Sequence, residues 1–292
     1  MRRLRKLGKK IGRGVAAALA ILFGYAAYVY LTVPDVRPLA TSNPETTAFI
    51  ELRAREARAK GEKPRRVQRW VPYRRISPQL VRAVLVTEDD KFWGHDGLDY
   101  EQIKESMEIN LERGEFARGA STITQQLAKN LYLSPSKNPV RKLRELIIAR
   151  RLESALPKQR ILELYLNVIE WGNGIYGAEA AARTYFGKPA SLLEPAESAL
   201  LAAAIANPRL MNPGQPTARL RRRQQMVLRR MGAVEPPPVL AGTSVELPSA
   251  DEIEPVPTLP PIGFPGALPG QAVPPPTTPK KPGGGGEDRP EP

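Results

Sequence analysis

Apolar residues in the middle of the chain recur at intervals of three and four, which is the spacing of amphipathic helices. The clearest case starts at Ser77-Pro78, a hydroxyl cap followed by a proline in the first turn, and continues through Leu80, Val84 and Leu85. The same pattern predicts helices over residues 100–111, 122–131, 139–156, 158–169, 178–186, 194–206 and 217–232. Strand signals are scarce, so we expect a mainly α fold.

Caps and inward faces follow from the same pattern. Capping side chains are expected at Asp99, Ser121, Asn138 and Thr217. The inward face of the helix over residues 100–111 is expected to comprise Tyr100, Ile103, Met107 and Leu111. The helix over residues 139–156 is expected to pack through Val140, Leu143, Leu146 and Ile147.

A different pattern covers the N-terminal region. Residues 15–33 form an uncharged run of nineteen, long enough to span a bilayer as a helix. Residues 1–14 hold seven basic and no acidic side chains, which predicts a cytoplasmic N-terminus and an extracytoplasmic remainder. The alternative is a cleaved signal peptide, which is disfavoured because its apolar region usually spans about 7–15 residues.

The rest of the chain divides into three parts. Residues 34–64 are expected to be a juxtamembrane spacer, in which residues 46–60 can form a charged helix at the membrane surface. Residues 65–232 carry the helical periodicity of a folded domain. Residues 233–292 are expected to be a disordered tail, because 17 of the 58 residues from Glu235 onward are proline and such a composition cannot build a core.

Composition limits the classes of partner and chemistry. The 292 residues carry a formal net charge of +14 and include no cysteine. A thiol nucleophile, a disulfide framework and a cysteine metal site are therefore excluded. A basic domain favours an anionic partner, such as a phosphorylated substrate, a membrane surface or nucleic acid. The predicted position outside the cytoplasm argues against nucleic acid.

An acidic triplet, Glu88-Asp89-Asp90, ends the first helix. Glu88 lies one turn after Val84 and therefore continues the apolar face of that helix. A carboxylate in such a position is costly unless it is paired or used in chemistry. The alternative is that the triplet merely solvates a helix end, as most charged runs do.

A polar run follows about thirty residues later and can bind a phosphate or a sugar through amides, hydroxyls and an ammonium gathered at a helix start. Its members are Ser121, Thr122, Thr124, Gln125, Gln126, Lys129 and Asn130. On the next helix Arg141, Lys142 and Glu145 lie on one side, because offsets of three and four are neighbours. The alternatives are an ordinary capped surface helix and a surface ion pair.

Four motifs occur in order: Glu-Asp-x-x-Phe-x-x-His-x-Gly from Glu88, Gly-Ala-Ser-Thr-x-Thr-Gln-Gln-x-x-Lys-Asn from Gly119, Arg-Lys-x-x-Glu from Arg141, and Lys-x-Arg-Ile-Leu-Glu-x-Tyr-Leu-Asn from Lys158. Together they resemble glycosyltransferase family 51, the peptidoglycan glycosyltransferases. The run from Glu170 to Arg183 is similar to the monofunctional branch of that family. A single short motif is weak evidence, whereas four in order are very specific.

The resemblance implies a lysozyme-like catalytic domain that polymerises lipid II and releases polyprenyl pyrophosphate. It implies that Glu88 is the general base, that Asp89 supports it, and that Glu145 acts at the leaving pyrophosphate. Glu145 is also the tentative ligand of a divalent cation, Mg²⁺ or Mn²⁺, which is implied by the resemblance alone. The cations expected to neutralise the pyrophosphate are Lys129, Arg141, Lys142 and Lys158. The histidine at His95, the only one in the chain, is expected to brace the loop beyond Glu88.

The expected location is the bacterial inner membrane, crossed once, with the catalytic domain on the periplasmic side. The expected partners are lipid II, the lipid-linked glycan, the membrane and other cell-wall synthases or division proteins, without nucleic acid. Two rival functions stay open at this point. One is a lysozyme-like enzyme that cleaves the wall, and the other is a non-enzymatic membrane scaffold.

Overall fold

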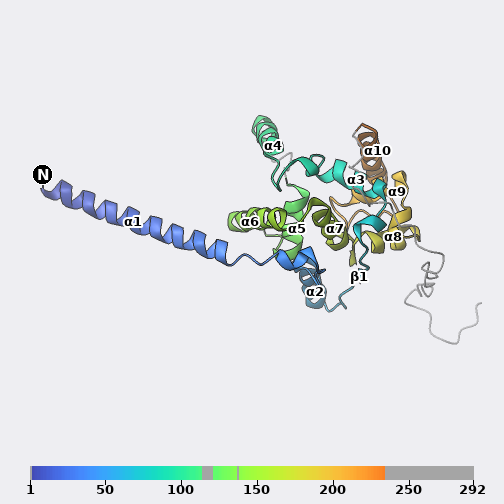
Figure 1. Cartoon of the computed structure of the whole chain (residues 1–292), viewed down its shortest axis with the longest axis horizontal. Coiled ribbons are helices and arrows are strands. Elements are labelled where there is room, and N and C mark those ends of the chain that lie inside the picture. The colour runs from blue at the N-terminus through green and yellow to red at the C-terminus, as the bar shows by residue number, and fades with distance from the viewer. Residues whose placement is uncertain (1, 114–120, 137, 234–292) are drawn as a thin grey trace, which may run out of the picture. The chain divides into compact units, whose positions relative to one another are not determined.

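A computed structural model describes residues 2–113, 121–136 and 138–233 of the chain (Figure 1). The α-helices are α1 (Arg2–Leu31), α2 (Ala48–Ala59), α3 (Pro78–Glu88), α4 (Tyr100–Arg113), α5 (Ile123–Tyr132), α6 (Pro139–Ala155), α7 (Lys158–Val168), α8 (Ala178–Phe186), α9 (Pro195–Ala204) and α10 (Ala218–Ala233). Short 3-10 helices are η1 (Arg37–Ala40), η2 (Tyr73–Arg75), η3 (Phe92–Gly94) and η4 (Ala190–Leu192). The mainly α fold predicted from the sequence is confirmed.

Three short strands form a small sheet in the order β1-β3-β2. They are β1 (Val67–Gln68), β2 (Glu170–Gly172) and β3 (Ile175–Tyr176). β1 pairs with β3 in parallel, with Val67 opposite Ile175, and β2 pairs with β3 antiparallel. The sheet joins the segment that precedes α3 to the loop that follows α7.

α5 is central to the folded part of the chain. It lies between α6 and α7 and is also contacted by α2 (Figure 1). A second group of helices comprises α3, α9 and α10, which pack against one another. Buried apolar side chains of both groups belong to one continuous core, which includes Leu80 and Val84 of α3, Leu127 of α5 and Leu201 of α9. The core therefore fixes the end of α3 against the start of α5.

Most of the expected caps are present. The Ser77 hydroxyl accepts a hydrogen bond from the Gln79 amide at 3.2 Å, and Asn138 accepts one from the Val140 amide at 2.8 Å. Asp99 and Thr217 cap α4 and α10 in the same way. The prediction for Ser121 was wrong. Thr122 caps α5 instead, because its hydroxyl accepts from the Gln125 amide and the Ser121 hydroxyl faces α6.

Two predicted packing faces were wrong in part, although Ile147 of α6 does pack against the core. On α4, Tyr100, Met107 and Leu111 are 69%, 67% and 85% exposed, and the buried residue is Ser106. On α6, Leu143 is exposed, and the buried face runs through Glu145, Ile148, Ala149 and Leu152. The α6 face is therefore rotated so that Glu145 points inward, an arrangement that hydrophobic periodicity cannot predict for a carboxylate.

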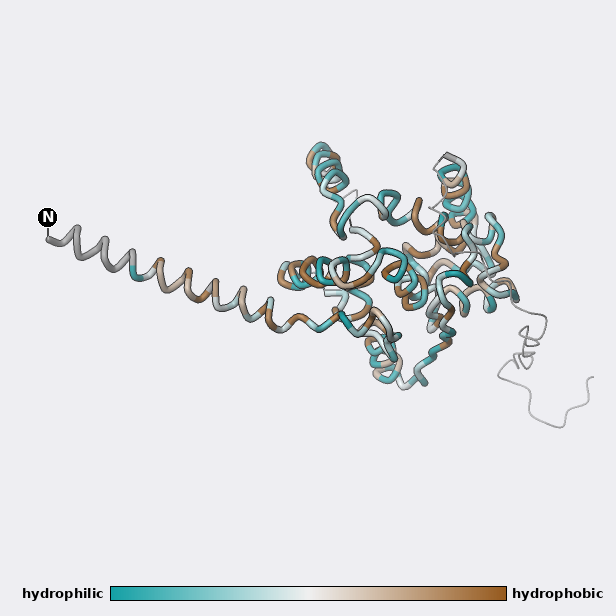
Figure 2. The backbone as a smooth tube through the Cα atoms, in the orientation of Figure 1, coloured by the Kyte–Doolittle hydropathy of each residue, from teal (hydrophilic) through white to brown (hydrophobic). Residues whose placement is uncertain are grey.

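The first helix contains a candidate membrane span. Residues 13–31 form the one segment of the described chain whose length and hydropathy would allow a helix to cross a membrane. Its apolar side chains, including Ile21 and Phe23, are mostly exposed. Figure 2 shows hydrophobic positions recurring along this part of α1. This agrees with the predicted single-pass anchor at residues 15–33.

The predicted spacer at residues 34–64 contains the helix expected over residues 46–60, but this helix packs against the folded domain. The helix is α2, which is capped by Thr47 and packs against α5. Arg53 on α2 forms an ion pair with Glu170 at 3.0 Å. The predicted loop at residues 115–119 and the proline-rich tail from residue 234 lie outside the described residues.

Candidate active site

Glu88 is the last residue of α3 and faces α5. Its Oε2 accepts a hydrogen bond from the side-chain amide of Gln126 at 2.8 Å. The carbonyl oxygen of that amide accepts a hydrogen bond from the Tyr165 hydroxyl at 3.0 Å. Tyr165 lies on α7, and its side chain is fully buried. The amide of Gln126 is thereby fixed from behind, with its N–H₂ group directed at the carboxylate.

The surroundings of Glu88 make its carboxylate a stronger proton acceptor. Burial raises the pKa of the Glu88 carboxyl, and neighbouring Asp89 adds to the rise. The hydrogen bond from Gln126 and the positive charges of Arg223 and Lys129 oppose it. Burial also raises the pKa of Tyr165 well above its usual value. The Tyr165 hydroxyl therefore stays protonated and donates a hydrogen bond to Gln126.

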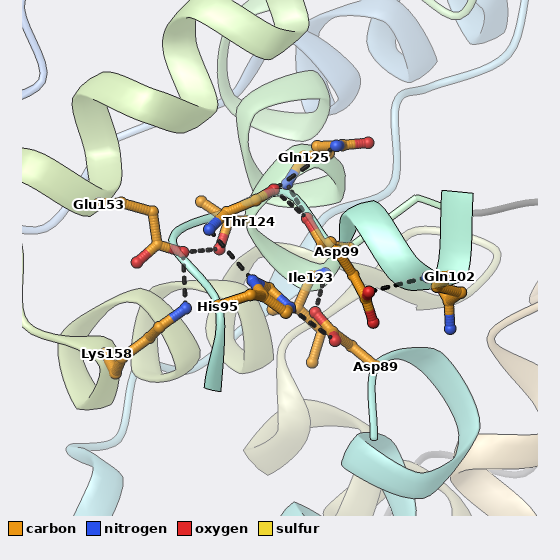
Figure 3. Close-up of polar contacts among 11 residues, drawn as sticks. Asp89, His95, Asp99, Gln102, Ile123, Thr124, Gln125, Glu153 and Lys158 are labelled. Carbon is orange, nitrogen blue, oxygen red and sulfur yellow. Dashed lines mark hydrogen bonds and ion pairs between the residues drawn. The ribbon is translucent and has the colours of Figure 1, made fainter. Parts of the chain in front are cut away.

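Asp89 locks the loop after α3 to the start of α5 (Figure 3). One of its carboxylate oxygens accepts from His95 Nε2 at 2.9 Å, and the other accepts from the backbone amide of Ile123 at 2.9 Å. His95 Nδ1 accepts from the Gly97 amide at 3.1 Å, so the histidine proton lies on Nε2. Asp89 is 3% exposed, and the hydrogen bond between Asp89 and His95 holds the loop beyond Glu88, as expected for His95.

A second set of contacts holds the same turn from the other side. The Thr122 hydroxyl donates to the Gly97 carbonyl at 2.7 Å. Gly97 has a φ of +83°, and a Cβ at this position would lie 2.9 Å from Cγ of Glu153. Glycine is therefore required here both by the backbone conformation and by the close approach of α6.

The predicted cluster on α6 is assembled. The Glu145 carboxylate is 3% exposed and accepts from the Lys142 ammonium at 2.5 Å and from the Arg141 guanidinium through its other oxygen. Lys142 also donates to Ser121 at 3.2 Å and to the side-chain oxygen of Gln125 at 3.0 Å. Residues of the second and third motifs thus meet at one ammonium group.

Lys129 carries a charge that interacts with both carboxylates, Glu88 and Glu145. It is half-buried on α5, and burial lowers the pKa of its ammonium, with a further lowering from Arg141 and Lys142. Glu145 and Glu88 both oppose this change, so both carboxylates act electrostatically on Lys129. Its ammonium lies 5.9 Å from the centre of the Phe49 ring on α2. No described residue accepts a hydrogen bond from it, which leaves its donors available to a ligand.

Three predicted binding residues lie in other contacts. Lys158 donates to Glu153 at 2.9 Å (Figure 3), and its ammonium lies 4.4 Å from the centre of the Phe92 ring. Thr124 donates to the same carboxylate at 2.5 Å. Asn130 donates to the backbone carbonyl of Gln126 at 2.8 Å. Lys158 and Thr124 thus connect α7 and α5 to α6, whereas the Asn130 contact lies within α5. None of the three bonds involves the Glu88 carboxylate or the Glu145 cluster.

The structure also brings in residues that sequence reasoning missed. They are Tyr165 of α7, Phe49 of α2 and Arg223 of α10. Arg223 donates to the Ala203 carbonyl at 3.1 Å and acts electrostatically on Glu88. No local signal could have placed Arg223 there, because it lies more than a hundred residues from Glu88 and only the packing of α10 against α3 brings them together.

The site does not fit a divalent cation as it stands. Both carboxylate oxygens of Glu145 are already bound by Arg141 and Lys142. Among the described residues, no group of three or more acidic or histidine side chains has the geometry of a metal site. Magnesium prefers carboxylate oxygens and water, and two bound cations occupy that position here. We therefore derive no step through a metal, and the expected Mg²⁺ or Mn²⁺ stays a prediction.

Comparison with known proteins identifies the family. A family model described as Transglycosylase matches residues 55–232. The biosynthetic peptidoglycan transglycosylase of Azoarcus sp. (strain BH72) is 47% identical over 206 residues, covering 70% of this chain and 88% of the relative. The proteins of the same name from Laribacter hongkongensis (strain HLHK9) and Thiobacillus denitrificans (strain ATCC 25259 / T1) are 45% and 42% identical. They cover 78% and 80% of this chain, and 99% and 100% of the relatives. The chain therefore belongs to the transglycosylase family.

Proposed function

We propose that this chain is a peptidoglycan glycosyltransferase that polymerises lipid II into glycan strands. The donor is the growing glycan on its polyprenyl pyrophosphate, and the acceptor is the 4-hydroxyl of the lipid II sugar. The observation that carries the proposal is that one helix, α5, contacts both groups: Gln126 donates to Glu88 at 2.8 Å, and Gln125 accepts from Lys142 of the Glu145 cluster at 3.0 Å. A base and a set of cations in one region are what an inverting transfer from a sugar pyrophosphate needs.

Each part of the site has a distinct task in this reaction. The acceptor hydroxyl attacks the anomeric carbon of the donor, and the bond from that carbon to the pyrophosphate oxygen breaks. Glu88 takes the proton of the hydroxyl and later returns it to water. The Gln126 amide keeps the Glu88 carboxylate in place through the bond to Tyr165. The leaving pyrophosphate carries the negative charge that develops.

The leaving group is stabilised by cations that are already oriented. Lys142 and Arg141 are held by the Glu145 carboxylate, so their side chains do not need to reorganise when the pyrophosphate binds. Lys129 supplies donors that no described residue uses. Glu145 thus acts on the pyrophosphate indirectly, by holding two cations, whereas Lys129 contacts it.

The arrangement disfavours the wall-cleaving alternative. A retaining glycoside hydrolase needs a second carboxylate as nucleophile, and an inverting hydrolase needs one as base. Glu145 is bound by two cations and nearly inaccessible, and Asp89 is committed to His95 and Ile123. Glu88 therefore lacks a second free carboxylate among the neighbours described here.

The proposal includes a membrane-held enzyme. The exposed apolar surface of α1 supports a single span, and the basic residues before it support a cytoplasmic N-terminus. The catalytic domain then lies on the extracytoplasmic side of the inner membrane, where the lipid-linked substrate presents its sugars. Interaction with other cell-wall synthases or division proteins stays part of this proposal.

The test is polymerisation of labelled lipid II by the detergent-solubilised full chain, with divalent cation present. Glu88→Gln keeps the shape of the side chain and removes the base, so we expect no polymer from it. Glu62→Gln is the matched control, because Glu62 is exposed in the loop after α2. Polymer from wild type and control alone supports both the reaction and the base.

The other outcomes each exclude part of the proposal. Polymer from Glu88→Gln would show that another group takes the proton. No polymer from the folded wild type would favour the scaffold. Release of fragments from finished wall, with no polymer from lipid II, would favour a hydrolase.

A further inference from the structure

The C-terminal end of α1 is bound by two arginines of α6. Arg151 donates to the Tyr30 carbonyl at 2.9 Å and to the Val33 carbonyl at 3.1 Å. Arg144 donates to the Thr32 hydroxyl at 2.6 Å. The guanidinium carbon of Arg151 also lies 4.7 Å from the centre of the Tyr30 ring.

These contacts complete a helix end that would otherwise be unsatisfied. The last carbonyls of a helix have no partner within it, and its C-terminus carries a partial negative charge. The Thr32 hydroxyl donates to the Tyr28 carbonyl at 2.7 Å, and Arg151 satisfies Tyr30. Val29 is 2% exposed, and Val33 belongs to the hydrophobic core. The end of the apolar helix is thus packed and bonded to the domain.

The same helix, α6, carries the cation cluster on another face. Arg144 and Arg151 are seven residues apart and so share a face, whereas Glu145 is on the buried face beside Ile148. Arg144 and Glu145 are adjacent in sequence. One helix of seventeen residues therefore carries both the contacts with the end of α1 and the Glu145 cluster.

We propose that Arg144 and Arg151, here called the anchor arginines, are positioning residues that hold the Glu145 cluster at a fixed height above the membrane. This inference rests on the function proposed above. A polyprenyl pyrophosphate held in a bilayer has its phosphates at a defined depth. The end of a membrane-spanning helix also lies at a defined depth. Fixing α6 to the end of α1 aligns Lys142 and Arg141 with the phosphates. The domain then does not lose orientational freedom when the substrate binds.

The proposal predicts a difference between two substrates. A substrate in a bilayer needs the enzyme at the correct height, whereas a water-soluble analogue with a short prenyl chain diffuses to the site in any orientation. Replacing both anchor arginines with alanine should lower kcat/KM for bilayer substrate by about tenfold relative to the short-chain analogue. The doubly substituted Arg144→Lys/Arg151→Lys protein should recover only part of this loss. Lysine keeps the positive charge, but its single ammonium cannot reach two acceptors as a planar guanidinium does.

The experiment uses the full chain in vesicles with full-length lipid II, and in dilute detergent with the short-chain analogue. Arg150→Ala/Arg219→Ala is the control, since it removes the same charge at exposed positions that do not contact α1. Thermal unfolding of each variant reports on its fold. The control should leave the ratio of the two kcat/KM values at the wild-type value.

Each result has a defined meaning. Equal losses on both substrates, or no loss on either, would overturn the positioning role of the anchor arginines. If the control changed the ratio by the same amount, the effect would be due to net charge, and the positioning role of the anchor arginines would again be overturned. If the folded wild type polymerises neither substrate, the proposed function itself fails, which is a different result from an unchanged ratio.

Discussion

Glu88 and Glu145 are carboxylates in opposite circumstances. Glu88 receives one hydrogen bond from a neutral amide, and burial raises its pKa. Glu145 is bound by an ammonium and a guanidinium on its two oxygens. The first is suited to accept a proton, and the second is suited to hold two cations in place. Environment, and not residue type, therefore assigns the two tasks.

The pH dependence of activity should report on Glu88. A general base works when it is deprotonated, so kcat/KM should fall as the pH falls through a pKa higher than the usual 4.5 of a glutamate. Gln126→Met removes a hydrogen bond that lowers this pKa, so the acid limb should move to higher pH. Gln79→Met, at the other end of α3, should leave the limb in place. An unmoved limb in Gln126→Met would contradict the assignment of the base.

The contribution of Glu88 to stability should fall as the pH rises, whereas its contribution to activity should increase. Because the folded-state pKa of Glu88 is raised, its contribution to stability is present below 4.5 and is lost as the pH rises through the folded pKa. Glu88→Gln removes a buried charge and should raise Tm at neutral pH. The difference from wild type should shrink as the pH is lowered toward the usual glutamate value. Calorimetry across this pH range measures the difference in Tm. A lower Tm for Glu88→Gln than for wild type at neutral pH would contradict the prediction that the buried charge destabilises the fold.

Two lysines that the sequence treated alike should behave differently. Lys142→Met removes a cation from the Glu145 cluster and should lower kcat/KM by about 10²–10³. Lys158→Met leaves the nearly buried Glu153 without its cation and should lower stability by about 3 kcal/mol while the folded enzyme keeps its kcat/KM. Steady-state kinetics beside urea unfolding separates the two effects. An equal loss of kcat/KM in the two variants would show that Lys158 also acts in the active site.

At the scale of elements, the site depends on how α3 meets α5. The loop after α3 is held to the start of α5 through Asp89 and Ile123, and through Gly97 and Thr122. This junction determines where the Glu88 carboxylate lies relative to Gln126. The helices themselves were predictable from periodicity, whereas their junction depends on contacts between residues about 25 to 35 positions apart.

Gly97→Ala tests that junction. Its positive φ and the approach of Glu153 make a Cβ unfavourable, and we expect a loss of about 1–3 kcal/mol in stability together with lower activity. Gly94→Ala is the control, because a Cβ there meets no atom within 4 Å. Chemical unfolding of both variants measures the difference. Equal stability of the two would show that the turn tolerates a side chain.

At the scale of the whole molecule, the residues assigned to the site all lie between α2 and α10. The family match covers residues 55–232, which includes all of them except Phe49. A chain ending at Ala233 should therefore polymerise lipid II in detergent at the wild-type rate. Loss of activity in this shortened chain, with its fold intact, would assign a catalytic contribution to the proline-rich region.

Much of this protein follows from its sequence. Periodicity and caps predicted α3, α6, α7 and α8 with nearly the observed bounds, because helix formation depends on neighbours three and four residues apart. The four motifs identified the residues around Glu88 and Glu145, because the chemistry requires those residue types. The uncharged run before residue 34 indicated the membrane span, because hydrocarbon thickness fixes the length of a spanning helix.

Tertiary structure alone decided which faces are buried and which side chains meet. The exposed apolar face of α4 and the inward position of Glu145 on α6 contradict simple periodicity, since burial depends on what packs opposite. The Tyr165–Gln126–Glu88 contact, the effect of Arg223 on Glu88 and the contacts of Arg144 and Arg151 with α1 join residues far apart in the chain. Local sequence cannot encode such contacts, because they exist only when the helices have packed into one core.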